Sequence, residues 1–261
     1  MPGEPETIQT ATLGFFGPIT LAYLCVCTSW LLMKYSSRRK WPDEPLVETE
    51  HKWVDLLMVA VGITGVFAVG EAYRNDWLIP KTGSWTDHPI SALNLSLPFA
   101  PIFLVLLIRR QSLATVWISS ISIQWKLLAG VVASLAGVAC FLAMRGELNR
   151  GEEILKDSMT IHSLIHAPAV FLEAVAIAFL FVRLKWVTGG FFAVLIGSLL
   201  FAAAHIPSGI QGGRPTIEIV QFFFFNTALA AFIFGVVAKS RDVIWIAIPH
   251  YFLDVAIGAF D

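Results

Sequence analysis

The chain alternates between long apolar runs and short polar segments, and most of the runs contain 18 to 22 residues. About 20 apolar residues are needed for a helix to cross the roughly 30 Å hydrocarbon core of a bilayer. The pattern therefore predicts an all-α, polytopic membrane protein with about eight transmembrane helices. The expected helices are Leu13–Met33, Val54–Ala72, Ile90–Ile108, Leu127–Met144, Ser163–Phe181, Trp186–Ile206, Ile217–Ala238 and Val243–Phe260.

Two features of the sequence are expected to shape these helices further. Pro98 and Pro101 should kink or delay the third one, because proline lacks a backbone N–H and clashes with the preceding turn. The glycine-rich segment GIQGGRP, which follows His205, should end the sixth. We divide the chain into residues 1–158, with helices one to four, and residues 159–261, with helices five to eight, within one membrane unit.

Composition supports a membrane protein. Apolar residues make up 56% of the chain and charged residues only 14%, whereas charged residues approach about a quarter of a soluble domain. Cys25, Cys27 and Cys140 lie within apolar runs without the spacing of metal ligands, so we interpret them as small core residues. The net charge is −1, and the basic residues fall in loops. This distribution indicates a lipid bilayer as partner and argues against nucleic acid.

The basic residues are unevenly distributed between alternate loops. One side collects twelve of them, Lys34, Arg38, Arg39, Lys40, Lys52, Arg109, Arg110, Lys126, Arg183, Lys185, Lys239 and Arg241. The other side collects six, Arg74, Lys81, Arg145, Arg150, Lys156 and Arg214. Because cytoplasmic loops carry the excess of Lys and Arg, twelve against six predicts both termini on the non-cytoplasmic side.

Ionisable side chains interrupt three of the expected helices near the C-terminus. They are Glu173, His205 and the pair His250 and Asp254. An ionisable group within a membrane helix costs several kcal/mol unless it is paired or hydrated, so these residues predict a buried polar site. Asp254 follows His250 by four residues and is adjacent to it on a helix, where it can hold the imidazole in one tautomer.

Two further histidines share the face of Glu173. On a continuous helix, His162 and His166 lie within about 20° of Glu173 in angular position. They predict a path for water or substrate toward that carboxylate. Other interpretations of these residues remain open. His162 and His166 could be interfacial, His205 could be a hydrogen-bonded core residue, and the other three could be structural.

The ordered polar residues resemble the CPBP family of intramembrane proteases, which includes the CAAX prenyl endopeptidases and bacteriocin-processing proteins. That family carries the motifs EExxxR, FxxxH and HxxxN/D on separate helices. Residues Phe201 to His205 match the second motif, and His250 to Asp254 match the third. The segments LLFAAAHIP and FIFGVVAKSRDVIWIAIPHYFLD are also similar to the family. The resemblance implies a CPBP-like helical bundle.

The first motif departs from the family pattern. Glu173 matches the first acid, but Ala174 and Ala178 stand where the family has the second acid and the arginine. Removing one half of a buried ion pair strands a charge, whereas replacing both halves with apolar residues can be neutral. The double loss is therefore compatible with catalysis. Asp254 is within the pattern, but unlike Asn an ionised Asp cannot donate a hydrogen bond to an oxyanion.

The resemblance implies hydrolysis of a peptide bond near a membrane-embedded or prenylated substrate terminus. Glu173 would activate water with the help of His205, and His250 would stabilise the oxyanion while Asp254 orients it. His205, His250 and Glu173 also form a possible zinc-ligand set, although the resemblance favours a metal-independent site. We expect all four catalytic candidates to face one cavity within the membrane.

Two other functions remain open on sequence grounds. A membrane scaffold or immunity protein could keep the fold without hydrolysis, as the altered first motif allows. A proton-coupled transporter could use His162, His166 and Glu173 as a relay, but the two halves of the chain show no repeat. The polar path starts at the less basic side. We therefore expect outward access, which favours exported or membrane peptides over cytosolic prenylated proteins as substrates.

Overall fold

The computed structural model describes residues 8–36, 52–80, 87–119 and 122–260, and these ranges contain helices and no strands. The α-helices in the first half are α1 (Ile8–Ser36), α2 (Lys52–Arg74), α3 (Asp87–Ser96), α4 (Ala100–Ile108) and α5 (Ile123–Arg145). Those in the second half are α6 (Gly151–Ser158), α7 (Ile161–Leu164), α8 (Ala167–Thr188), α9 (Gly190–Ala204), α10 (Ile206–Gln211), α11 (Thr216–Ser240) and α12 (Ile244–Gly258). Short 3₁₀ turns are η1 (Leu97–Phe99), η2 (Leu113–Val116) and η3 (Leu148–Arg150). The all-α fold class is confirmed.

Seven helical segments in the described ranges are long and apolar enough to cross a membrane. An eighth apolar helix, α12, has 15 residues, which corresponds to a length of about 22 Å. This is shorter than the roughly 30 Å hydrocarbon core. The chain is thus an integral, multi-pass membrane protein, and its last helix is the shortest of the set.

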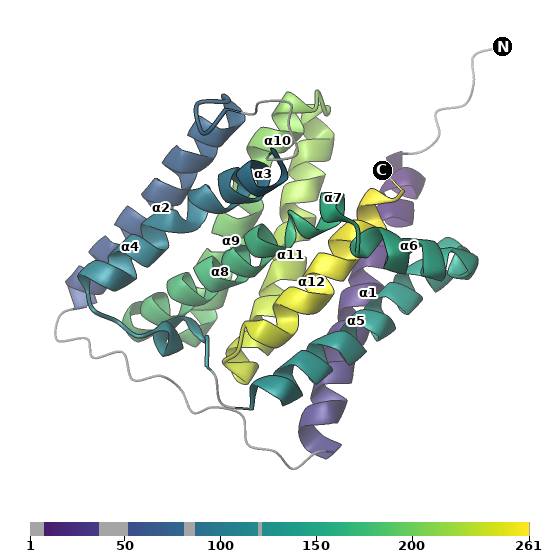
Figure 1. Cartoon of the computed structure of the whole chain (residues 1–261), viewed down its shortest axis with the longest axis horizontal. Coiled ribbons are helices and arrows are strands. Elements are labelled where there is room, and N and C mark those ends of the chain that lie inside the picture. The colour runs from purple at the N-terminus through teal and green to yellow at the C-terminus, as the bar shows by residue number, and fades with distance from the viewer. Residues whose placement is uncertain (1–7, 37–51, 81–86, 120–121, 261) are drawn as a thin grey trace.

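The long helices alternate in direction through the bundle (Figure 1). The start of α1 and the end of α12 lie at the same end of the bundle, and the end of α11 and the start of α12 lie at the opposite end. This arrangement agrees with an even number of crossings. Lys34, Lys126, Lys185 and Lys239 consequently lie toward one end of the bundle, and Arg145 and Arg214 toward the other.

Proline breaks the third and fifth expected helices. The third consists of α3, the turn η1 and α4, as Pro98 and Pro101 predict. The fifth was expected to be continuous from Ser163, and this expectation was wrong. The helix is interrupted at residues 165–166 between α7 and α8, because Pro168 occupies the first turn of α8, where its missing N–H is best tolerated.

The boundary between the fifth and sixth helices also differs from the expectation. We predicted a loop at residues 182–185, but α8 continues to Thr188 and turns at Gly189, whose φ is +83°. Arg183, which was assigned to that loop, is 1% exposed. Its guanidinium donates a 3.1 Å hydrogen bond to the Phe179 carbonyl and another to Gln111. These hydrogen bonds satisfy N–H donors of the guanidinium, which would otherwise be buried without partners.

The N-terminal end of α12 is held by a buried ion pair. Lys126 of α5 pairs with Asp242, and both side chains are at most 1% exposed. Asp242 also accepts hydrogen bonds from the backbone N–H groups of Ile244, at 2.8 Å, and Trp245, at 3.3 Å, which start α12. Burial raises the pKa of Asp242 above its ordinary value, although Lys126 opposes this shift. The pair therefore joins α5 to α12.

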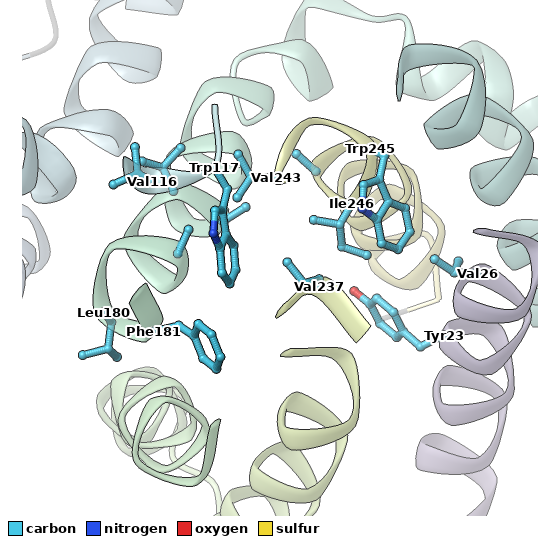
Figure 2. Close-up of a cluster of buried hydrophobic side chains, with 14 of the residues drawn as sticks. Tyr23, Val26, Val116, Trp117, Leu180, Phe181, Val237, Val243, Trp245 and Ile246 are labelled. Carbon is cyan, nitrogen blue, oxygen red and sulfur yellow. The ribbon is translucent and has the colours of Figure 1, made fainter. Parts of the chain in front are cut away.

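Aromatic packing holds α1 against the same helix. Trp30 of α1 stacks on Trp245 of α12 with ring centroids 5.2 Å apart, and both rings are fully buried. Figure 2 shows Trp245 and Ile246 on the side of α12 toward Tyr23 and Val26 of α1, with Val237 of α11 near Tyr23 and Ile246. The core thus brings α1, α11 and α12 together around the site described next.

Candidate active site

Glu173 lies two turns into α8, on the half of the helix that points toward the α7 end of the bundle. Its side chain is half-buried. The next residue, Ala174, is 7% exposed and faces the bundle interior. Because α8 packs against α2, α9 and α12, the helix places Glu173 beside the face of α12 that carries the third motif.

His205 caps the C-terminal end of α9. Its ring nitrogen Nδ1 lies 2.9 Å from the Phe201 carbonyl oxygen, one turn earlier. A carbonyl can only accept, so this contact assigns the proton to Nδ1. In the neutral imidazole the lone pair then belongs to Nε2, which is the state required of a group that takes a hydrogen bond from water.

His250 and Asp254 lie one turn apart on α12, as their spacing predicts. Nε2 of His250 is 3.6 Å from Oδ2 of Asp254, which is an ion-pair distance too long for a hydrogen bond. The His250 side chain is 19% exposed and the Asp254 side chain 46% exposed. Asp254 also borders two cavities.

An inner cavity of about 250 Å³ lies between α1, α8, α9, α11 and α12. His205, His250 and Asp254 supply three of its polar walls, and Tyr23, Asn226 and Arg214 supply the others. The remaining walls are apolar and include Ala174, Ile177, Phe201, Phe222, Phe225, Leu229, Ile233, Phe234 and Ile246. This lining suits an apolar chain with a few fixed polar groups.

A second cavity, of about 670 Å³, carries the two histidines of α7 and its C-terminal turn, and we call it the histidine cavity. His162, His166 and Glu173 line it together with Asp254. Thr160, Ser163, Asp157 and Tyr251 add further polar groups. The rings of His162 and His166 are 6.3 Å apart between centroids. The two histidines thus line the same space as Glu173 even though α7 and α8 are separate helices.

Asp254 lines both cavities and joins the two groups of polar residues. It interacts electrostatically with His250, Glu173 and His205, and His250 interacts with Glu173 as well. The structure therefore brings the four side chains near one another. They line two cavities, however, and not the single cavity that we expected. Glu173 borders the histidine cavity, whereas Ala174 and Ile177, on the adjacent face of α8, border the inner one.

Sequence reasoning counted Arg214 only as a loop residue, and it missed two uncharged polar residues of the inner cavity, Tyr23 and Asn226. Tyr23 is 7% exposed and interacts electrostatically with Asp254 and Glu173. Asn226 follows four phenylalanines on α11 and is half-buried. Each is a single polar residue within an apolar run, which is the signal that selected Glu173. Tyr and Asn carry no formal charge, so the search for ionisable groups passed over them.

The zinc-ligand set that the sequence left open does not assemble in the described part of the chain. No group of three or more His, Cys, Asp or Glu side chains there is arranged to hold a metal ion. His205 and His250 line the inner cavity without Glu173. These residues therefore do not fit a bound zinc ion in this conformation.

The two alanines of the altered first motif are buried. Ala174 is 7% exposed, and Ala178 is 0% exposed. Ala178 is enclosed by its neighbours, whereas Ala174 forms part of the wall of the inner cavity. Neither position carries a charge, so the absence of both residues leaves no buried charge without its partner.

These features define a polytopic membrane protein with a carboxylate and histidine cluster inside its helical bundle. Residues 156–256 match the family model described as Rce1-like, type II CAAX prenyl endopeptidase Rce1-like. The match spans the end of α6 through most of α12 and includes all four catalytic candidates. This match agrees with the resemblance that the motifs indicate over the same part of the chain. Searches of curated proteins and of solved structures found no match.

Proposed function

We propose that the protein is an intramembrane endopeptidase in which Glu173 activates a water molecule to hydrolyse a peptide bond. The observation that carries this proposal is the mutual proximity of Glu173, His250 and Asp254 where the two cavities meet. Burying a carboxylate and a histidine inside a membrane bundle costs free energy, so such residues are rare there and typically mark a functional site. Their family match adds a protease context for the same residues.

The reaction follows from the chemistry of these groups. Glu173 takes a proton from water, and the water oxygen forms a bond to the carbonyl carbon while the carbonyl π electrons move to its oxygen. Nε2 of His205 accepts a hydrogen bond from the same water. The tetrahedral intermediate collapses as the C–N bond breaks, and Glu173 returns the proton to the leaving amine. His250 donates a hydrogen bond to the oxyanion, and Asp254 favours its protonated form.

The two cavities suit the two reactants. The histidine cavity carries donors and acceptors from His162 to Glu173, which is the lining that water requires. The inner cavity is mostly apolar, which suits the side chains or lipid of a membrane-embedded substrate. The peptide would then occupy the inner cavity, and water would reach its scissile carbonyl from the histidine cavity. Asp254 would lie where the two cavities meet.

The access side determines the substrate class. His162 and His166 lie toward the end of the bundle that carries fewer basic residues. By the positive-inside rule this end faces away from the cytoplasm. We therefore propose exported or membrane peptides as substrates rather than prenylated cytosolic proteins, whose C-termini lie on the opposite side.

The test is cleavage of membrane peptides by the full chain purified in detergent. The panel contains apolar peptides and a peptide ending in a farnesylated cysteine motif, with products identified by mass spectrometry. Glu173→Gln keeps the size of the side chain but removes the base, so cleavage should fall by about 10² to 10⁴-fold. Glu218→Gln, at an exposed carboxylate on α11, serves as the matched control and should keep the full rate.

Equal rates for Glu173→Gln and the unmodified protein would reject Glu173 as the base. Absence of cleavage of every peptide by the unmodified protein would instead favour a scaffold or immunity protein. Ala174 and Ala178 are the specific residues that support that second candidate, because apolar packing at these positions removes a charged pair of the family pattern. Binding of a peptide without its cleavage would identify this function.

A further inference from the structure

Tyr23 of α1 presents its hydroxyl to the inner cavity. Its side chain is 7% exposed. In Figure 2 its oxygen points away from α1 toward Val237 and Ile246, which both line the same cavity. No hydrogen bond within the described residues uses this oxygen, and it is open to the cavity that Tyr23 lines. A tyrosine hydroxyl on the wall of a mostly apolar cavity is available to donate to a bound ligand.

The hydroxyl lies near the catalytic candidates. Tyr23 interacts electrostatically with Asp254 and Glu173, and its side chain lines the cavity with His205 and His250. The position is fixed by packing, because the neighbouring Val26 sits against Gly137 of α5. A β-carbon at Gly137 would lie only 2.6 Å from Val26 Cγ2. The α1 backbone therefore holds the phenol at a constant depth.

The site is short of one hydrogen-bond donor. Asp254 stands at a position where an asparagine could donate to an oxyanion, and an ionised aspartate can only accept. His250 then remains as the single donor among the four catalytic candidates. A neutral tyrosine carries an O–H donor and keeps its proton near neutral pH.

We infer that Tyr23 is a catalytic residue that donates a hydrogen bond from its hydroxyl to the carbonyl oxygen of the scissile peptide, together with His250. The inference rests on the proposed peptidase function. No proton leaves Tyr23. The O–H···O contact strengthens as negative charge develops on the oxygen and weakens when the intermediate collapses. The donor comes from a helix outside residues 156–256, so the family-like segment alone forms an incomplete site.

Tyr23→Phe tests this role because it removes only the oxygen. We expect the kcat for peptide cleavage by the full chain in detergent to fall by about 10² to 10³-fold, as for other single oxyanion donors, with KM nearly unchanged. A peptide phosphonate, which mimics the tetrahedral intermediate, should lose affinity by a similar factor. The uncleaved substrate peptide bound to a Glu173→Gln background should not.

Tyr35→Phe is the matched control. Tyr35 lies on the same helix α1, but its side chain is 77% exposed and lines neither cavity, so its substitution should leave both the cleavage rate and the ratio of phosphonate to substrate affinity unchanged. A Tyr23→Phe rate within twofold of the unmodified protein overturns the inference while leaving the peptidase function intact. An equal loss of phosphonate and substrate affinity overturns it too, because it indicates a structural role. Absence of all cleavage by the unmodified protein overturns both proposals.

Discussion

Asp254 is the residue on which the geometry of the site depends most. It borders both cavities, interacts electrostatically with Glu173, His205 and His250, and follows His250 by one helical turn. Asparagine would lose the charge that favours protonated His250 but would gain an N–H donor. The identity of residue 254 therefore sets which other side chains must donate to the oxyanion.

Substitution of Asp254 tests this dependence at the residue scale. Asp254→Asn should raise kcat in the Tyr23→Phe background by about tenfold, since a restored donor contributes roughly 1.4 kcal/mol or more to the transition state. In the unmodified background the same change should bring no gain. The measurement is a double-mutant cycle on kcat. Losses that simply multiply in the double variant would show that residues 23 and 254 act independently.

The candidate site was only partly accessible from the sequence. Glu173, His205, His250 and Asp254 could be found because an ionisable residue stands out within an apolar helix. Tyr23 could not, because a tyrosine on a membrane helix is common at interfaces. Its role depends on the packing of α1 against α5, which brings residue 23 close to residue 254 across more than two hundred positions of the chain.

At the scale of elements, α12 is positioned by close contact with α5. Pro249 in α12 provides no N–H for the Trp245 carbonyl one turn earlier. That carbonyl faces Gly130 of α5, where a β-carbon would lie 2.9 Å from the carbonyl oxygen and 2.5 Å from Ile248 Cδ1. Gly130 is thus required for the approach of the helix that carries His250.

Gly130→Ala should consequently lower stability by about 1 to 3 kcal/mol, because a backbone oxygen cannot move aside as a side chain can. Thermal unfolding in detergent, followed by circular dichroism, measures the change. Gly70→Ala is the matched control, since nothing lies within 4 Å of its β-carbon position on α2. It should be neutral or stabilise by up to about 1 kcal/mol. Equal melting temperatures for the two variants would contradict the close-contact argument.

Helix existence was predictable, but some helix ends were not. Pro98 and Pro101 revealed the break between α3 and α4 because proline acts locally. Arg183 misled the prediction of the end of α8, since a charge in an apolar run suggests a loop. Its hydrogen bonds to Phe179 and Gln111 are tertiary and allow the helix to continue. Such partners are not visible in sequence patterns.

At the scale of the whole molecule, the helix that carries His250 and Asp254 depends for its position on helices outside the family match. Residues 156–256 carry the motif residues, while α1 and α5 lie outside this segment and determine where α12 sits. The stacked Trp30 and Trp245 and the buried pair of Lys126 and Asp242 cross this division. The N-terminal helices are therefore part of the site and not an independent anchor.

The orientation of the molecule in the membrane is a prediction from the basic residues, and it can be tested directly. His162 lies on α7 and lines the histidine cavity, whereas Lys239 lies at the opposite end of the bundle on α11. Both side chains are exposed. The sequence assigns twelve basic residues to one side and six to the other, and by the positive-inside rule this predicts that the Lys239 end faces the cytoplasm. Single cysteines at these positions, in a background without Cys25, Cys27 and Cys140, can be probed in intact cells with a membrane-impermeant thiol reagent. We expect labelling at position 162 and none at position 239 until the cells are permeabilised. The reverse pattern would turn the histidine cavity toward the cytoplasm, and prenylated cytosolic C-termini would then become the fitting substrates.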